Sequence, residues 1–234
     1  MANIRMPRGA IPSPRYKLAA AVPHVVIGTT PANYLNIPKK ISYWGNDVHG
    51  DCVTAEEAFA KACNNPEVFI SDQVAINWAT RHGFLNGAVL IDVLEAMATS
   101  GFQQTGQTFD DGACFSVDWT NAALLSNAIA NGPVKIGVGG DQLNDVYNAN
   151  SAKNGWFATG FQPEPNEDHC VSLCGTGTIG WLAQALNVAV PAGVDGTQPG
   201  YGLFTWDSIG IIDMPSMLAI TQEAWLRNPT TVIK

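Results

Sequence analysis

Cys52 is the residue in this chain whose type and setting best suit covalent chemistry. It follows Gly50 and Asp51, and the residues after it favour a helix, with Asp51 in the position of the N-cap. A thiol in a first helical turn lies at the positive end of the helix dipole, which favours the nucleophilic thiolate. The alternative is a buried cysteine that behaves as a small apolar side chain.

A histidine far downstream supplies the base that such a thiol needs. His169 opens the apolar run Cys170–Cys174, which ends at Gly175 and Gly177 and is typical of a strand bounded by turn residues. A cysteine nucleophile and its histidine meet in space and not in sequence. Cys52 and His169 therefore form a candidate nucleophile–base pair.

Five short blocks occur in the order known from one enzyme family. They are Asn46, Gly50, Asp51 and Cys52, similar to Gln-x-x-x-Gly-Ser-Cys; Asn86-Gly87-Ala88, similar to Asn-Gly-Gly; Ala128 to Val134, similar to Ala-Ile-x-x-x-Pro-Val; Asp168 to Val171 with Gly175-Thr176-Gly177, similar to Asp/Asn-His-Ala-Val and Gly-Tyr-Gly; and Asp207 to Gly210, similar to Asn-Ser-Trp-Gly. Over residues 41–219 the chain thus resembles the papain-like cysteine proteases.

The resemblance implies an α+β fold of the papain-like type, with a helical half that carries the nucleophile and an antiparallel β half that carries the histidine. We expect a papain-like domain over residues 41–234, divided into a helical half (about 41–114) and a β-rich half (about 115–234). Residues 1–40 are rich in proline and predict an extended segment that wraps the domain surface. The propeptide of the family is longer and helical, so this stretch does not resemble it.

Hydrophobic spacing predicts the elements that position the candidate residues. Helices are expected over 51–63, 71–81, 90–99 and 119–131, with a short helical piece at 142–148. Strands are expected over 115–119, 134–138, 155–161, 170–174, 181–190 and 202–206. Helices first and strands later fit an α+β protein.

The resemblance also implies roles for the remaining site residues. Asp207 takes the place of the third catalytic residue, which would orient His169 and raise its pKa. Asn46 takes the place of an oxyanion-hole glutamine and is one methylene shorter. Substrate contacts are implied for Gly50, the turn Asn86, Gly87 and Ala88, and Asp168. The pair itself predicts that Cys52 has a pKa well below the usual value of about 8.5.

Composition bears on the other function classes. The net charge is −8 and the pI is about 4.8, with no basic stripe to neutralise phosphates, so no nucleic-acid partner is expected. No apolar run is long enough to cross a membrane, and prolines interrupt the N-terminal stretch, so we read neither a membrane span nor a signal peptide and take the cytoplasm as the default location. Five cysteines do not imply a disulfide framework, and no cofactor or metal spacing is present.

Three functions remain open. The first is a cysteine peptidase that acts on a peptide or protein substrate. The second is an acyl transferase that uses the same Cys–His pair. The third is a non-catalytic papain-like scaffold, which is favoured by Asn46 in place of Gln, Val53 after the nucleophile and Ile209 in place of Trp.

Overall fold

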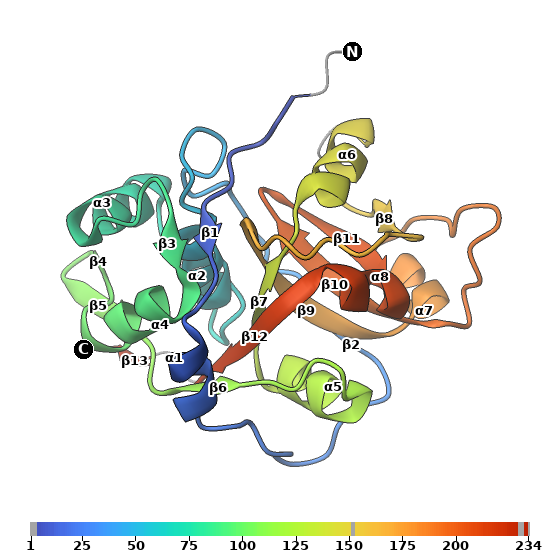
Figure 1. The fold of residues 1–234 in the computed structure, drawn as a ribbon, viewed down its shortest axis with the longest axis horizontal. Coiled ribbons are helices and arrows are strands. Elements are labelled where there is room, and N and C mark those ends of the chain that lie inside the picture. The colour runs from blue at the N-terminus through green and yellow to red at the C-terminus, as the bar shows by residue number, and fades with distance from the viewer. Residues whose placement is uncertain (1–3, 151–152, 229–231, 234) are drawn as a thin grey trace.

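Two lobes, one mainly helical and one built around a sheet, form the molecule, and the N-terminal segment runs between them (Figure 1). The computed structural model of the chain describes residues 4–150, 153–228 and 232–233. This α+β architecture confirms the predicted fold class.

The helical lobe contains three helices and a small antiparallel sheet. The helices are α2 (Cys52–Ala62), α3 (Asp72–His82) and α4 (Leu90–Thr99). The sheet contains β4 (Phe102–Gln104), β5 (Gln107–Asp110) and β13 (Val232–Ile233), in the order β13-β5-β4. In α4, Val93, Leu94 and Met97 are buried at the helical spacing that the sequence predicted.

The second lobe is an eight-stranded sheet, as far as the described residues go. Along its main path lie β6 (Cys114–Ser116), β12 (Thr221–Arg227), β7 (Val134–Val138), β9 (His169–Thr178), β10 (Pro199–Thr205), β11 (Ser208–Asp213) and β8 (Phe157–Ala158), while β2 (Tyr34–Leu35) also pairs with β9. Every pairing is antiparallel except that of β8 with β11. Helices α5 (Ala122–Asn131), α6 (Asp141–Ala149), α7 (Ile179–Ala185) and α8 (Met214–Ile220) surround it.

The sequence predicts helices α2, α3 and α4 correctly, but it misses β4 and β5. Further errors lie in the second half. Residues 181–190 were expected to form a strand, but Ile179–Ala185 is the helix α7, whose first turn is capped by the Thr178 side chain through the N–H of Trp181. The strand expected at 155–161 shrinks to the two residues of β8. Strands β11 and β12 were not predicted.

Helix α2 lies at the centre of the molecule, and all of its 11 residues are buried. It carries one basic and two acidic side chains, Lys61, Glu56 and Glu57. Glu57 forms ion pairs with Lys135 and with Arg227, and Lys61 forms one with Asp111. These pairs join α2 to the sheet lobe and to the segment after β5.

Burial acts differently on the two glutamates of α2. Burial opposes ionisation of Glu57, but Arg227 and Lys135 outweigh it and hold the pKa of Glu57 below the usual range. Desolvation raises the pKa of Glu56 well above its ordinary value.

The N-terminal segment differs from the expected surface wrap. Residues 7–13 lie between the lobes, where β1 (Ala10–Ile11) pairs in parallel with β3 (Ala88–Val89). Helix α1 (Arg15–Ala20) follows and is tied to α4 by the Lys17 ammonium, 2.8 Å from Asp92 and 2.7 Å from Glu95. The prediction of a surface-wrapping segment is therefore wrong for residues 7–13.

Candidate active site

Cys52 is the first residue of α2, and its side chain is buried at the line where the two lobes meet. The sulfur accepts hydrogen bonds from the backbone N–H groups of Gly9, in the N-terminal segment, and of Cys170, the residue after His169. The helix start and the histidine strand thus converge at this point. They bring the nucleophile and the base of the expected pair into one region.

The expected low pKa of Cys52 is wrong for this state of the molecule. Burial raises the pKa of the thiol to about 12, and the neighbouring carboxyls of Asp51 and Glu56 act in the same direction, while the two backbone N–H groups oppose it. Desolvation therefore outweighs the backbone N–H groups that favour the thiolate. Asp51 adds nothing as a cap, because its side chain makes no capping hydrogen bond.

His169 is the first residue of β9 and is also fully buried. Its Nε2 lies 2.7 Å from Oγ1 of Thr205, and the Trp206 ring stacks on the imidazole with centroids 4.7 Å apart. Its Nδ1 has no hydrogen-bond partner among the residues described. Burial, with a smaller contribution from Arg8, lowers the pKa of His169 to about 3. The covered pair is therefore thiol and neutral imidazole, not thiolate and imidazolium.

Asp207 does not hold the histidine, which corrects the sequence-based assignment. Its Oδ1 accepts a hydrogen bond from the Tyr147 hydroxyl at 2.7 Å, and Tyr147 in turn bonds the Tyr43 hydroxyl at 2.7 Å. Asp207 lies in the turn between β10 and β11, whereas Thr205 ends β10 beside β9. The side chain that meets His169 is therefore two residues earlier than expected.

Asn46, the expected oxyanion donor, lies against the N-terminal segment. The side chain is buried, and its Nδ2 donates to the carbonyl of His49 at 2.9 Å and to the carbonyl of Pro7 at 3.2 Å. The Trp206 indole N–H points at the same Pro7 carbonyl, at 3.4 Å. A peptide carbonyl from the N-terminal segment thus occupies the place where two side-chain donors meet.

Three glycines from separate parts of the chain let the segment pass close to Cys52. A Cβ on Gly9 would lie 1.9 Å from the Gly50 carbonyl oxygen and 3.0 Å from Cα of Gly87. The Gly9 carbonyl accepts a hydrogen bond from the Ala88 N–H at 2.8 Å. The expected substrate wall, Gly50 with Gly87 and Ala88, therefore contacts an extended peptide, whereas Asn86 is exposed.

Asp168 forms the opposite wall of this cleft. Its backbone carbonyl accepts the Ala10 N–H at 3.1 Å, and its carboxylate accepts the Gly140 N–H at 3.0 Å. The same carboxylate lies 3.0 Å from the Arg8 guanidinium. Burial raises the pKa of Asp168, and Arg8 opposes that shift.

Several of these residues carry no recognisable signal in the sequence. Thr205 and Trp206 fall outside the resembling blocks, and nothing in the composition of residues 7–13 indicates that they lie over the thiol. Only the proximity of Thr205 to Asp207 in the sequence marked the region. The part of the chain that the structure describes holds no cluster of three or more potential metal ligands. It also holds no helix of the length and apolarity needed to traverse a bilayer.

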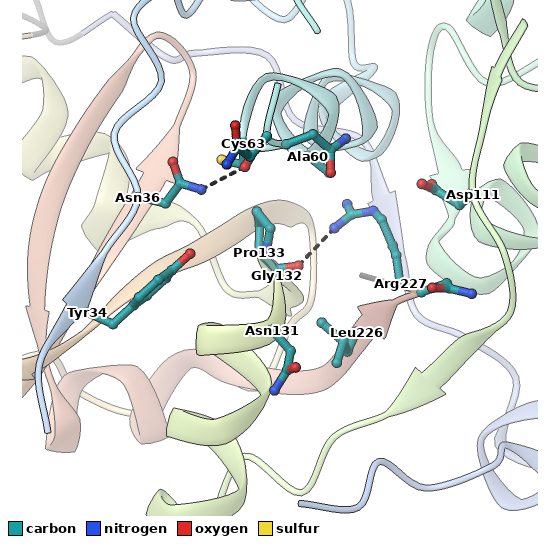
Figure 2. Close-up of a pocket in the computed structure, with 13 residues that line it drawn as sticks. Tyr34, Asn36, Ala60, Cys63, Asp111, Asn131, Gly132, Pro133, Leu226 and Arg227 are labelled. Atoms are coloured by element: carbon teal, nitrogen blue, oxygen red, sulfur yellow. Dashed lines mark hydrogen bonds between the residues drawn. The ribbon is translucent and has the colours of Figure 1, made fainter. Parts of the chain in front are cut away.

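A second pocket lies at the other end of α2 (Figure 2). Asn36 Nδ2 donates to the Cys63 carbonyl at 2.7 Å, which joins the two lobes, and within the sheet lobe Arg227 Nη1 donates to the Pro133 carbonyl at 3.1 Å. With 11 residues, α2 separates this pocket from Cys52 by roughly 16 Å. The pocket is therefore separate from the cleft that holds the candidate pair.

Comparison with solved structures identifies the fold. Xylellain, a cysteine protease from Xylella fastidiosa, superposes with a TM-score of 0.64 at 13% identity, covering 96% of this chain and 98% of that one. The ragweed pollen cysteine protease Amb a 11 in its proform gives 0.61 at 12% identity, covering 91% and 73%. The Carica candamarcensis protease CMS1MS2 in complex with E-64 gives 0.58 at 15% identity, covering 85% and 98%.

The chain therefore has the fold of papain-like cysteine proteases. No protein-family model matches the sequence, and no curated protein matches it either. The likeness is one of fold, at 12–15% identity in these three structures.

Proposed function

We propose that this protein is a papain-like cysteine peptidase that binds extended peptides between its two lobes and cleaves them through Cys52 and His169. The observation that carries the proposal is the peptide already in the cleft: residues 7–13 of the chain. Its Pro7 carbonyl meets the Asn46 amide, and its Gly9 N–H meets the Cys52 sulfur. The cleft is thus shaped to hold a peptide backbone against the candidate nucleophile.

Displacement of the segment would change the protonation of the pair. The thiol is neutral because it is buried, and the imidazole is neutral for the same reason. Water or a substrate in place of the segment lowers the desolvation cost of both charges, so the Cys52 proton can move to His169. For Nδ1 to take that proton, Nε2 must carry the ring hydrogen and donate it to Thr205.

The chemistry then follows from the positions of the donors. The thiolate attacks the scissile carbonyl carbon, and the developing oxyanion is stabilised by Asn46 Nδ2 and by the Cys52 backbone N–H, which belongs to the first helical turn and has no partner within the helix. His169 returns the proton to the leaving amine. Water, activated by the same imidazole, hydrolyses the acyl-enzyme and restores the thiol.

One observation favours a second candidate, a non-catalytic scaffold. A cleft filled by the chain's own segment, with a neutral thiol and a neutral imidazole, also suits a protein that only holds peptides. The two candidates differ in what happens once the segment is displaced.

The test uses the Gly9→Ala variant of the full chain. The added Cβ has no room beside Gly50, so the segment must lift, and we expect iodoacetamide labelling of Cys52 and hydrolysis of a fluorogenic peptide library to rise at least about tenfold over wild type. Val25→Ala is the control, because it lies in the same N-terminal stretch and its side chain is 65% exposed.

Three outcomes separate the functions. Hydrolysis that disappears in Cys52→Ala supports the peptidase. Faster labelling without any cleavage supports the scaffold and contradicts the proposal. Product transfer to an added amine, in place of release to water, identifies an acyl transferase.

A further inference from the structure

A recess on the α6 side of the cleft encloses the Arg8 side chain. Arg8 Nη2 donates to Oδ1 of Asp141 at 2.6 Å, and Nη1 lies 3.0 Å from Oδ2 of Asp168. The Arg8 side chain is only 5% exposed, although that of Asp141 is 74% exposed. The recess therefore buries a guanidinium while part of its acidic rim faces solvent.

Gly140 gives the recess its depth. A Cβ at this position would lie 2.8 Å from Cδ and 3.0 Å from Nη1 of Arg8, and 2.8 Å from Cβ of His169. The Gly140 N–H also donates to Oδ1 of Asp168 at 3.0 Å, which fixes the carboxylate that faces the guanidinium. The room for the cation and the orientation of its partner thus come from the same residue.

The occupant belongs to the segment that fills the peptide cleft. Arg8 follows Pro7, whose carbonyl meets the Asn46 amide, and precedes Gly9, whose N–H meets the Cys52 sulfur. Its side chain therefore enters the recess from a backbone that lies where the substrate backbone would lie.

We propose that the recess is a subsite for a basic side chain of the substrate, formed by Asp141, Asp168 and Gly140. In this structure Arg8 occupies the subsite in place of the substrate side chain. The proposal rests on the proposed function for its substrate class, basic peptides. Arg5 supports it, since its guanidinium lies 3.7 Å from the same Asp141. The net charge of −8 adds a field that attracts such peptides.

The geometry favours arginine over lysine. Two carboxylates approach the guanidinium at different nitrogens, and a planar fork of N–H donors can serve both at once. The lysine side chain is shorter, and its ammonium group is a single point charge. We expect the order of preference arginine, then lysine, then glutamine.

The test compares peptides that differ only at one residue. Peptides with arginine or glutamine at the varied position, labelled with fluorescein, are titrated into full-length Cys52→Ser/Arg8→Ala, in which the recess is vacated and no cleavage occurs. We expect the arginine peptide to bind at least about tenfold tighter, as one charge-assisted hydrogen bond would give.

Two further variants test the recess itself. Adding Asp141→Asn, which removes one of the two carboxylate charges, should lower the ratio toward one, and adding Asp168→Asn as well should bring it close to one. Asp72→Asn on the exposed start of α3 removes the same charge elsewhere and should leave the ratio unchanged. Equal binding of the two peptides, or binding of neither, overturns the proposal.

Failure of this inference can be distinguished from failure of the proposed function. If Arg8→Ala with Cys52 intact cleaves arginine and glutamine peptides equally well, the peptidase stands and the subsite does not. If the arginine preference appears in binding but no peptide is cleaved, the subsite stands and the peptidase does not.

Discussion

The side chain that bonds His169 carries a hydroxyl group, which can orient the imidazole ring without stabilising its charged form. Thr205 Oγ1 accepts the hydrogen that Nε2 must carry if Nδ1 is to act as the base. A carboxylate in that position would also stabilise the imidazolium, but Asp207 is engaged by Tyr147. Thr205 is therefore a positioning residue that sets the tautomer of His169. The positive charge of the imidazolium is stabilised by solvent and by the Cys52 thiolate.

Replacing Thr205 by valine should lower kcat for peptide hydrolysis roughly tenfold, the effect of one lost hydrogen bond of ~1.4 kcal/mol, with KM nearly unchanged. Thr205→Ser should restore most of the rate, because it keeps the hydroxyl. The measurement is steady-state hydrolysis in the Gly9→Ala background.

Asp207→Asn is the matched control for that experiment, since Asp207 bonds Tyr147 and not the histidine. A larger loss of kcat in Asp207→Asn than in Thr205→Val would show that Asp207 is the orienting residue once the cleft is vacated.

At the scale of one element, α2 joins the lobes through charges as well as apolar contacts. Its apolar positions Ala55, Phe59 and Ala62 lie on one face, but the whole helix is buried. Its charged positions are accommodated because Lys61 meets Asp111 and Glu57 meets two cations. Breaking such a pair leaves a buried charge without a partner, which costs more than the pair itself contributes.

Lys61→Met should therefore reduce the free energy of unfolding by about 3–5 kcal/mol, because it leaves the Asp111 carboxylate buried and unpaired. Lys61→Met/Asp111→Leu should recover most of the loss. Urea unfolding followed by tryptophan fluorescence gives the values.

The exposed counterpart is Lys17→Met, which removes the ion pairs of Lys17 with Asp92 and Glu95 at partly solvated sites. Its effect should stay within about 1 kcal/mol. Similar losses of unfolding free energy in Lys17→Met and Lys61→Met would contradict the prediction. They would mean that a buried ion pair of α2 is no costlier to break than a partly solvated one.

At the scale of the whole molecule, buried carboxyls set how stability depends on pH. Burial, reinforced by the nearby Glu223 carboxyl, raises the pKa of Glu167 from its usual 4.5 to about 9. A raised folded-state pKa means that the contribution of Glu167 is complete below pH 4.5 and is lost as the pH rises toward 9. Asp51 acts in the same direction, because burial raises its pKa to about 8.

Glu167→Gln should flatten the fall of Tm between pH 5 and pH 9, because the amide cannot ionise. A tenfold difference in proton affinity between the folded and unfolded chain corresponds to ~1.4 kcal/mol, or about 3–6 °C in a chain of this size. Thermal unfolding in a pH series measures it, and the exposed Glu67→Gln should keep the wild-type slope. Parallel slopes for Glu167→Gln and wild type would contradict the assignment.

Local patterns were enough to predict the fold class and the main helices, because α3 and α4 follow apolar periodicity and turn residues. Cys52 and His169 are indicated as the candidate pair by their local sequence settings and by short motifs that occur in the same order as in the papain-like family. The partner of His169 could not be predicted, because it depends on the register of β10 against β9. The filled cleft was also beyond prediction, since pairing of Ala10 with Ala88 joins segments far apart in sequence. Desolvation, which reverses the expected pKa shifts, is a property of the assembled molecule.

The hydrogen bond from the Gly9 N–H to the Cys52 sulfur makes the thiol a reporter on the motion of its cover. A reagent can reach the sulfur only while residues 7–13 are lifted. At low reagent concentration the alkylation rate equals the open fraction multiplied by the intrinsic rate of an accessible thiol. At high concentration the rate reaches a plateau set by the opening step alone. One reagent titration would thus give both the opening equilibrium and the opening rate, without any knowledge of the substrate.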